Sequence, residues 1–120
     1  MKQVLIVDDN KDIVDIIEDE FSEKKVKVIK ANNGKDAFDI IRNNSIDFVI
    51  SDIRMPDGDG VELLNNINSL KEHKPKLIFM TGFAEISKDE AMKRGCYAFL
   101  KKPLDWEELS DLVDKLLREK

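Results

Sequence analysis

The stretch FVISDIRMPDGDG, residues 48–60, starts as an apolar run and reaches Asp52 just before proline, glycine and further aspartates appear. The apolar run has the composition of a buried strand, and the residues after Asp52 are those that form turns. A buried strand is therefore predicted to end on a carboxylate.

Three other apolar runs also end on polar side chains. They are QVLIVDD (3–9), KLIFMT (76–81) and YAFLKKP (97–103). The first ends on two aspartates, the second on a threonine, and the third on two lysines followed by a proline. If these runs are neighbouring parallel strands, their polar end groups share one edge of the sheet.

Segments with a helical period separate the apolar runs. In residues 11–23 this period places four apolar side chains on one face: Ile13, Ile16, Ile17 and Phe21. An Asp or Ser three positions before a Glu marks three helix starts, at Asp59, Ser87 and Asp105. The expected helices are 11–23, 34–43, 60–70, 88–94 and 106–118.

A further strand is predicted at KVKVIKA, residues 25–31, where lysines interrupt the apolar residues as they do in edge strands. The strands at 4–7, 47–51 and 77–80 are nearly continuous in apolar residues, as strands buried on both faces are. Strands and helices alternate, which indicates an α/β fold with a doubly wound, five-stranded parallel sheet. The flavodoxin-like strand order 2-1-3-4-5 is the common solution. We expect one domain over residues 1–120.

Composition excludes several classes of function. A net charge of −5 disfavours binding to nucleic acids or anionic membranes, which requires clustered lysine and arginine. One cysteine, Cys96, cannot form an intrachain disulfide, and with the one histidine, His73, it cannot form a zinc site of Cys/His type. The sequence contains neither a membrane-spanning run nor a leader pattern. A cytoplasmic location is expected.

The predicted fold brings three carboxylates together. Ligands of doubly wound sheets bind beyond the carboxyl ends of the strands, where the strand order reverses. Asp8, Asp9 and Asp52 would meet there, and crowded carboxylates either raise their pKa values or bind a cation. Mg²⁺ prefers carboxylate, water and phosphate oxygens. Thr81 and one of the two lysines at the end of the last strand would flank the cation and donate hydrogen bonds to a phosphoryl group.

Four motifs resemble the receiver domains of two-component response regulators, the CheY-like superfamily. In chain order they are LIVDDN, FVISDIRMPDGDG, LIFMTGF and FLKKPL. The resemblance covers essentially the whole chain, and the motifs are specific as a set although each alone is weak. It implies a phosphoacceptor domain of a two-component system or phosphorelay in bacterial signalling, with the strand order given above.

The resemblance assigns the metal and phosphoryl chemistry to residues of the first two motifs. Asp52 would be the phosphoacceptor and would carry an aspartyl phosphate. Asp8, Asp9, Asp52 and the backbone carbonyl of Arg54 would bind Mg²⁺, for which Mn²⁺ could substitute. A sensor histidine kinase or a histidine phosphotransfer protein would donate the phosphoryl group.

The resemblance assigns the response to residues of the last two motifs. Thr81 and Lys102 would bind the phosphoryl group, and the peptide bond before Pro103 would be cis. Thr81 and Phe99 would form the switch, because a shift of the threonine makes room for the aromatic ring. This would change the surface of the fourth helix, fifth strand and fifth helix, which controls an output domain or target protein.

Two bulky residues are predicted to tune the switch. Arg54 and Phe83 each follow a site residue by two positions, so their side chains would hinder the water that hydrolyses the aspartyl phosphate. The domain would act as a signalling switch rather than as an enzyme with a separate substrate, and would contact neither nucleic acid nor membrane.

Two other functions remain open at this stage. Haloacid dehalogenase-like phosphatases also use an aspartate nucleophile, Mg²⁺, a threonine and a lysine, but that family has a second aspartate where this chain has Arg54. A phosphorylation-independent interaction module is the other alternative, although it would need none of the site residues. The chain is either a stand-alone regulator or part of a larger regulator or hybrid kinase.

Overall fold

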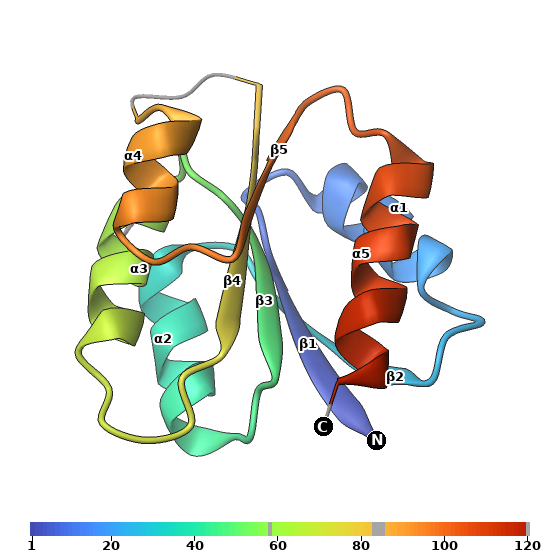
Figure 1. The fold of residues 1–120 in the computed structure, drawn as a ribbon, viewed down its shortest axis with the longest axis horizontal. Coiled ribbons are helices and arrows are strands. Elements are labelled where there is room, and N and C mark those ends of the chain that lie inside the picture. Colours follow the sequence, from blue (N-terminus) through green and yellow to red (C-terminus); the bar gives the residue numbers. More distant parts are fainter. Residues whose placement is uncertain (58, 83–85, 120) are drawn as a thin grey trace.

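The computed structural model describes residues 1–57, 59–82 and 86–119. Within them, strands and helices alternate along the chain (Figure 1). The strands are β1 (Lys2–Val7), β2 (Val26–Ala31), β3 (Phe48–Asp52), β4 (Lys76–Thr81) and β5 (Ala98–Lys101). The helices are α1 (Lys11–Glu20), α2 (Gly34–Asn43), α3 (Gly60–Asn68), α4 (Lys88–Lys93) and α5 (Trp106–Arg118). Every predicted element is present, with ends that differ by a few residues.

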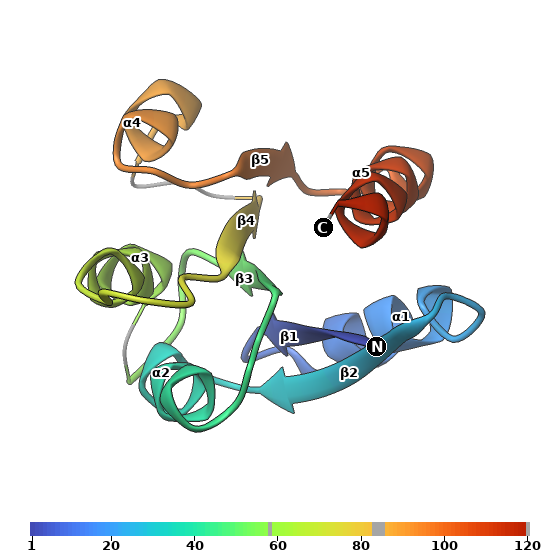
Figure 2. The same cartoon turned by 60° about the horizontal axis from the view of Figure 1, so that its bottom comes forward.

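The strands form one parallel sheet in the order β2-β1-β3-β4-β5, which confirms the predicted α/β fold and flavodoxin-like topology. Figures 1 and 2 show α1 and α5 on one face of the sheet and α2, α3 and α4 on the other. The chain runs from β1 outward to β2 and then returns past β1 to β3. The strand order therefore reverses between β1 and β3, where ligands of such sheets bind.

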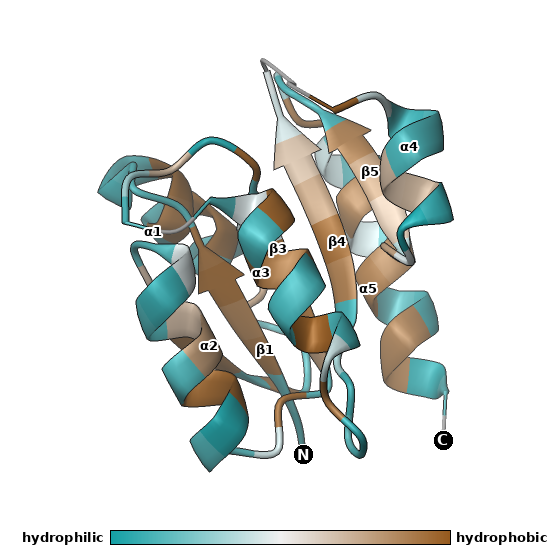
Figure 3. Ribbon diagram, turned by 90° about the vertical axis from the view of Figure 1, so that its left-hand side faces the viewer, coloured by the Kyte–Doolittle hydropathy of each residue, from teal (hydrophilic) through white to brown (hydrophobic). Residues whose placement is uncertain are grey.

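The sheet separates two apolar cores. In β1, Leu5 and Val7 belong to the core beneath α2 and α3, whereas Val4 and Ile6 belong to the core beneath α1 and α5. All four side chains are fully buried, which explains why this strand is continuous in apolar residues. Figure 3 shows β1 in the hydrophobic colour between α2 and α3, whose ribbons alternate between hydrophilic and hydrophobic residues.

The strand β2 lies at an edge of the sheet, as its lysines predicted. Within the part of the chain that the structure describes it pairs only with β1, and Lys27 and Lys30 are exposed. Among the described residues, no helix combines the length and the apolar character needed to cross a membrane.

Side-chain caps fix where the helices begin. The predicted caps Asp59, Ser87 and Asp105 each accept a hydrogen bond from the backbone N–H three positions later. Asn33 caps α2 with the same three-residue spacing, whereas Asn10 caps α1 by accepting from the N–H of Asp12, two positions later. Each cap satisfies an N–H group that has no partner within its helix.

The predicted apolar face of α1 is wrong at one position. Ile16 is 44% exposed, whereas Val14 is 5% exposed and Ile17 and Phe21 are buried. Successive residues turn by about 100° around a helix, and the buried face is centred between Val14 and Ile17. Ile16 lies about 130° from the centre of that face, outside it, and reaches solvent.

Candidate functional site

Three aspartates meet at the carboxyl ends of two paired strands. Asp8 and Asp9 follow β1, and Asp52 is the last residue of β3, which pairs with β1. One carboxylate oxygen from each aspartate lies within 4.8 Å of those from the other two. Asp8 is 1% exposed and Asp52 9%, while Asp9 is exposed. The predicted convergence of these residues is confirmed.

Lys102 is the lysine that reaches the aspartates. Its Nζ donates hydrogen bonds of 3.1 Å to Asp8 Oδ2 and of 3.1 Å to Asp52 Oδ2. The neighbouring Lys101 is exposed. The residue pattern alone did not decide which of the two lysines belongs to the site. The structure places the ammonium of Lys102 between the carboxylates of Asp8 and Asp52.

The backbone sets the position from which Lys102 extends. Its N–H donates a hydrogen bond of 2.9 Å to the carbonyl oxygen of Thr81, just beyond the paired residues of β4 and β5. The Lys102–Pro103 peptide bond is cis, as the resemblance implied. The end of β5 is thereby tied to the end of β4 next to the aspartates.

Main-chain N–H groups orient the two buried carboxylates. Ile53 donates to Asp52 Oδ1 at 2.7 Å, and Asn10 donates to Asp8 Oδ1 at 2.9 Å. The side chain of Asn10 also accepts from the N–H of Asp12 at 3.0 Å, so this residue both begins α1 and holds Asp8. Sequence reasoning missed Asn10, although an asparagine directly before a helical pattern is a recognised signal for a helix start.

The electrostatics of the site reflect burial and the shared lysine. Burial raises the pKa of Asp8, the hydrogen bond from Asn10 and the ammonium of Lys102 lower it, and the charge of Asp52 adds to the rise. The pKa of Asp8 ends above its ordinary value. Burial lowers the pKa of Lys102, but Asp8 and Asp52 outweigh this effect and leave the pKa raised. Lys102 therefore stays charged, while the ionised form of Asp8 is disfavoured without a further cation.

The other predicted site residues differ in burial, and one of them lies outside the described residues. Thr81 is 4% exposed at the end of β4. Phe99 is 8% exposed, and its ring meets that of Phe79 edge to face, with centroids 6.5 Å apart at an interplanar angle of 80°. The side chain of Arg54 is exposed, and Phe83 lies outside the described residues.

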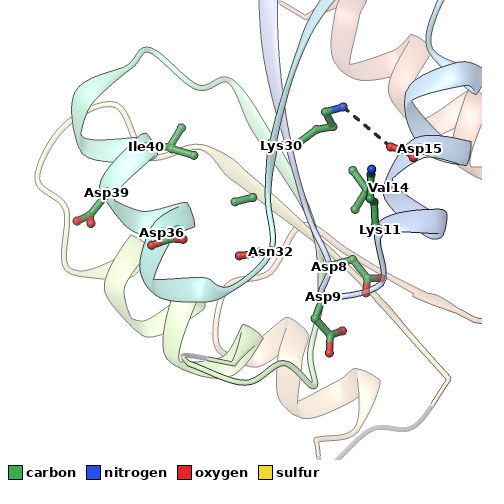
Figure 4. Close-up of a pocket in the computed structure, with 11 residues that line it drawn as sticks. Asp8, Asp9, Lys11, Val14, Asp15, Lys30, Asn32, Asp36, Asp39 and Ile40 are labelled. Atoms are coloured by element: carbon green, nitrogen blue, oxygen red, sulfur yellow. Dashed lines mark ion pairs between the residues drawn. The ribbon is translucent and has the colours of Figure 1, made fainter.

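A groove of about 670 Å³ opens beside Asp8 and Asp9 (Figure 4). It lies between the starts of α1 and α2 and the end of β2, with Lys30 on one wall in an ion pair of 4.0 Å with Asp15. Of the three aspartates, Asp8 and Asp9 line this groove.

The arrangement fits a small divalent cation. Carboxylate oxygens from Asp8, Asp9 and Asp52 lie close enough together to contact one ion, and Mg²⁺ favours such hard oxygen ligands. A cation there would also compensate the unfavourable charge of Asp8. The ammonium of Lys102 and the hydroxyl of Thr81 add the donors that an anionic group beside the cation would need.

Comparison with known proteins decides the family. The sequence profile of the response regulator receiver domain matches residues 4–114 of the chain. The chain belongs to this family. Members of this family are signalling domains of two-component response regulators. Receiver domains generally bind Mg²⁺ at an acidic pocket, and Asp8, Asp9 and Asp52 form an acidic cluster in this chain.

Relatives of this receiver domain include both short and long proteins. The regulatory protein AtoC of Escherichia coli is 32% identical over 98% of the chain and 26% of its own length. Sporulation initiation phosphotransferase F of Bacillus subtilis is 31% identical over 97% of the chain and 94% of its own length. The receiver domain of the Francisella response regulator 1452 has a TM-score of 0.87 and 30% identity, covering 97% of this chain and 96% of that one. The chain thus spans about a quarter of some relatives and nearly all of others.

Replacement of Asp8 by asparagine is expected to change how stability depends on pH in the metal-free receiver domain. The pKa of Asp8 is higher in the folded protein than its ordinary value of 3.8, so folding favours the protonated form. The stability that protonated Asp8 contributes is fully present below the pKa that Asp8 has in the unfolded chain. It is lost as the pH rises through the pKa that Asp8 has in the folded protein. At pH 7 the variant Asp8→Asn should therefore be more stable than the wild type.

The measurement is urea unfolding between pH 4 and pH 8 in the presence of a chelator. The stability advantage of Asp8→Asn over the wild type should shrink as the pH falls, because the wild-type carboxylate then becomes protonated. An advantage of Asp8→Asn that grows on acidification would show that the sign of the pKa shift is wrong.

Proposed function

We propose that Asp52 is the phosphoacceptor of this receiver domain and that Asp8, Asp9, Asp52 and the backbone carbonyl of Arg54 bind Mg²⁺. The observation that carries the proposal is the contact of Lys102 with both Asp8 and Asp52, each at 3.1 Å. The ammonium of Lys102 contacts two of the three clustered aspartates. This arrangement supports a site in which the carboxylates bind a cation and the ammonium binds an anionic phosphoryl group. Mn²⁺ is expected to replace Mg²⁺, because it prefers the same oxygen ligands.

The phosphoryl donor is a phosphohistidine of a sensor kinase or of a histidine phosphotransfer protein. A carboxylate oxygen of Asp52 forms a bond to phosphorus, the bond from phosphorus to the donor imidazole breaks, and the imidazole nitrogen keeps that electron pair. Bound Mg²⁺ supplies neutralisation of the phosphoryl oxygens. Lys102 leaves Asp52 Oδ2 and donates a hydrogen bond to a phosphoryl oxygen instead. The hydroxyl of Thr81 also donates a hydrogen bond to a phosphoryl oxygen.

The response passes from Thr81 to Phe99. Thr81 moves towards the phosphoryl group, and the ring of Phe99, which now rests against Phe79, turns into the space vacated. The surface affected is that of α4, β5 and α5, where a groove of about 490 Å³ lies over Phe99 and Leu112. Met92 of α4 is 42% exposed beside this groove and offers an apolar contact to an output domain or target protein.

Two residues are proposed to set the lifetime of the aspartyl phosphate. The exposed side chain of Arg54 follows Asp52 by two positions, and Phe83 follows Thr81 by the same distance in sequence. Their bulk would restrict the approach of water to phosphorus. Phe83 lies outside the described residues, so this part of the proposal is based on its sequence position.

The proposed setting is the bacterial cytoplasm. Residues 1–120 act as a single receiver domain, and the output domain or target protein that it controls is distinct from these residues. The net charge of −5 argues against direct contact with nucleic acid or with an anionic membrane. The domain catalyses steps of its own phosphorylation and dephosphorylation and has no separate substrate.

The test of this function is incubation with acetyl phosphate, with Mg²⁺ or with a chelator, followed by intact-mass measurement over time. We expect one phosphoryl group to be gained only with Mg²⁺, and then to be lost by hydrolysis once the donor is removed. A failure to gain it from acetyl phosphate and also from a phosphorylated histidine phosphotransfer protein would contradict the proposal. Repeated turnover of a phosphoester substrate would instead indicate a phosphatase.

A further inference from the structure

Gly60, the first residue of α3, is packed directly against the residue proposed to be phosphorylated. A Cβ atom at this position would lie 2.6 Å from the carbonyl oxygen of Asp52, 2.8 Å from Cα of Ile53 and 2.8 Å from Cε1 of Phe79. Side-chain carbon atoms essentially never approach other atoms this closely. The close approach of α3 to the end of β3 therefore requires the absence of a side chain.

The same residue closes the segment between β3 and α3. The backbone N–H of Gly60 donates a hydrogen bond of 2.7 Å to the carbonyl oxygen of Ile53. Ile53 in turn donates its own N–H to Asp52 Oδ1. This pair of bonds connects the start of α3 through one residue to the carboxylate of Asp52, and it brings together the two ends of the segment that contains Arg54.

The atoms around Gly60 have little freedom to move away. Two of the three belong to the backbone of Asp52 and Ile53, and Asp52 ends β3, which is paired with β1 and β4 on either side. The third belongs to the fully buried ring of Phe79, which also contacts Phe99. A side chain at position 60 would therefore displace the start of α3 rather than the strand.

We propose that Gly60 is a positioning residue for the metal and phosphoryl chemistry of Asp52. Its contact with β3 holds the segment after Asp52 in the conformation in which a backbone carbonyl of that segment points at the cation. The inference rests on the proposed function, because it concerns the same metal site. Gly60 touches neither metal nor phosphoryl group and acts through the backbone of Asp52 and Ile53.

The test compares Gly60→Ala with Gly95→Ala by calorimetric titration of Mg²⁺ and by urea unfolding. Gly95 has φ +102°, a conformation strained for alanine, and it lies before β5, at the opposite end of the sheet from the aspartates. Both variants should lose stability. Only Gly60→Ala should weaken Mg²⁺ binding, by about tenfold or more, while the Kd of Gly95→Ala stays within about twofold of the wild type. An unchanged Kd for Gly60→Ala would overturn the inference.

A second measurement needs no substitution and decides the question if Gly60→Ala does not fold. If Mg²⁺ binds only the conformation in which the N–H of Gly60 donates to the carbonyl oxygen of Ile53, saturation with Mg²⁺ reduces the population in which this hydrogen bond is broken. Hydrogen exchange of the Gly60 amide in the wild type should then slow by about tenfold or more with saturating Mg²⁺, whereas an unchanged rate would overturn the inference. A wild-type protein that binds no Mg²⁺ and gains no phosphoryl group would instead refute the proposed function itself.

Discussion

Replacement of Asp52 by asparagine is expected to abolish the phosphoryl adduct completely. An amide oxygen is too weak a nucleophile to attack phosphorus, and the acyl phosphate requires a carboxylate. The fold should survive, because the asparagine oxygen still accepts the hydrogen bond that Ile53 now donates to Asp52 Oδ1. Lys102 keeps its second partner, Asp8. Intact mass after incubation with acetyl phosphate and Mg²⁺ should equal that of the untreated protein.

The matched control for this variant is Asp36→Asn. Asp36 is an exposed aspartate in the first turn of α2, on the wall of the same groove as Asp8 and Asp9. Asp36→Asn changes the local charge by the same amount and should gain the phosphoryl group as the wild type does. A persistent adduct on Asp52→Asn, mapped by peptide analysis to another aspartate, would show that the phosphoacceptor has been assigned to the wrong residue.

Replacement of Phe79 by alanine is expected to have the largest effect on stability. The ring is fully buried in β4, in edge-to-face contact with Phe99 and against the backbone at Gly60. Removing a buried phenyl ring leaves a cavity and typically costs about 3–5 kcal/mol. Domains of this size have a total unfolding free energy of about 5–15 kcal/mol, so the variant should lose a large share of it. Urea unfolding at pH 7 measures the loss.

The control for the buried ring is Phe38→Ala, the same substitution at a partly buried ring of α2. Phe38 is partly exposed, with the guanidinium carbon of Arg42 lying 5.2 Å from the ring centroid. Its removal should cost less than half as much, because part of the ring already contacts solvent. Equal losses for Phe38→Ala and Phe79→Ala would contradict the expectation that the burial of each ring sets its contribution to stability.

The strand order and the acidic centre could be predicted because they depend on local patterns and chain order. Apolar runs that end on Asp8, Asp9 and Asp52 identify strand ends, and parallel strands align their carboxyl ends. Once β1 and β3 are neighbours, these side chains have to converge, and they do so within 4.8 Å. This prediction requires only the order of the strands and no further knowledge of which remote segments are in contact.

Other features of the site could not be predicted in this way. Residue pattern alone did not distinguish Lys101 from Lys102, because the choice depends on where each side chain points at the end of β5. Successive residues of an extended chain project in opposite directions, and in this fold Lys101 reaches solvent while Lys102 reaches Asp8 and Asp52. The family resemblance supplied this choice, and the structure gives its physical basis.

The sequence by itself determined the alternation of strands and helices, the buried character of β1, β3 and β4, and the three aspartates at strand ends. Hydrophobic period, turn residues and chain order carry this information locally. Only the tertiary structure decided that Ile16 faces solvent, that Asn10 orients Asp8, and that Gly60 rests on the backbone of Asp52. The exposure of Ile16 and the contact of Gly60 with Asp52 exist only after the helices have docked on the sheet, whereas the bond from Asn10 to Asp8 depends on how the short segment after β1 turns into α1.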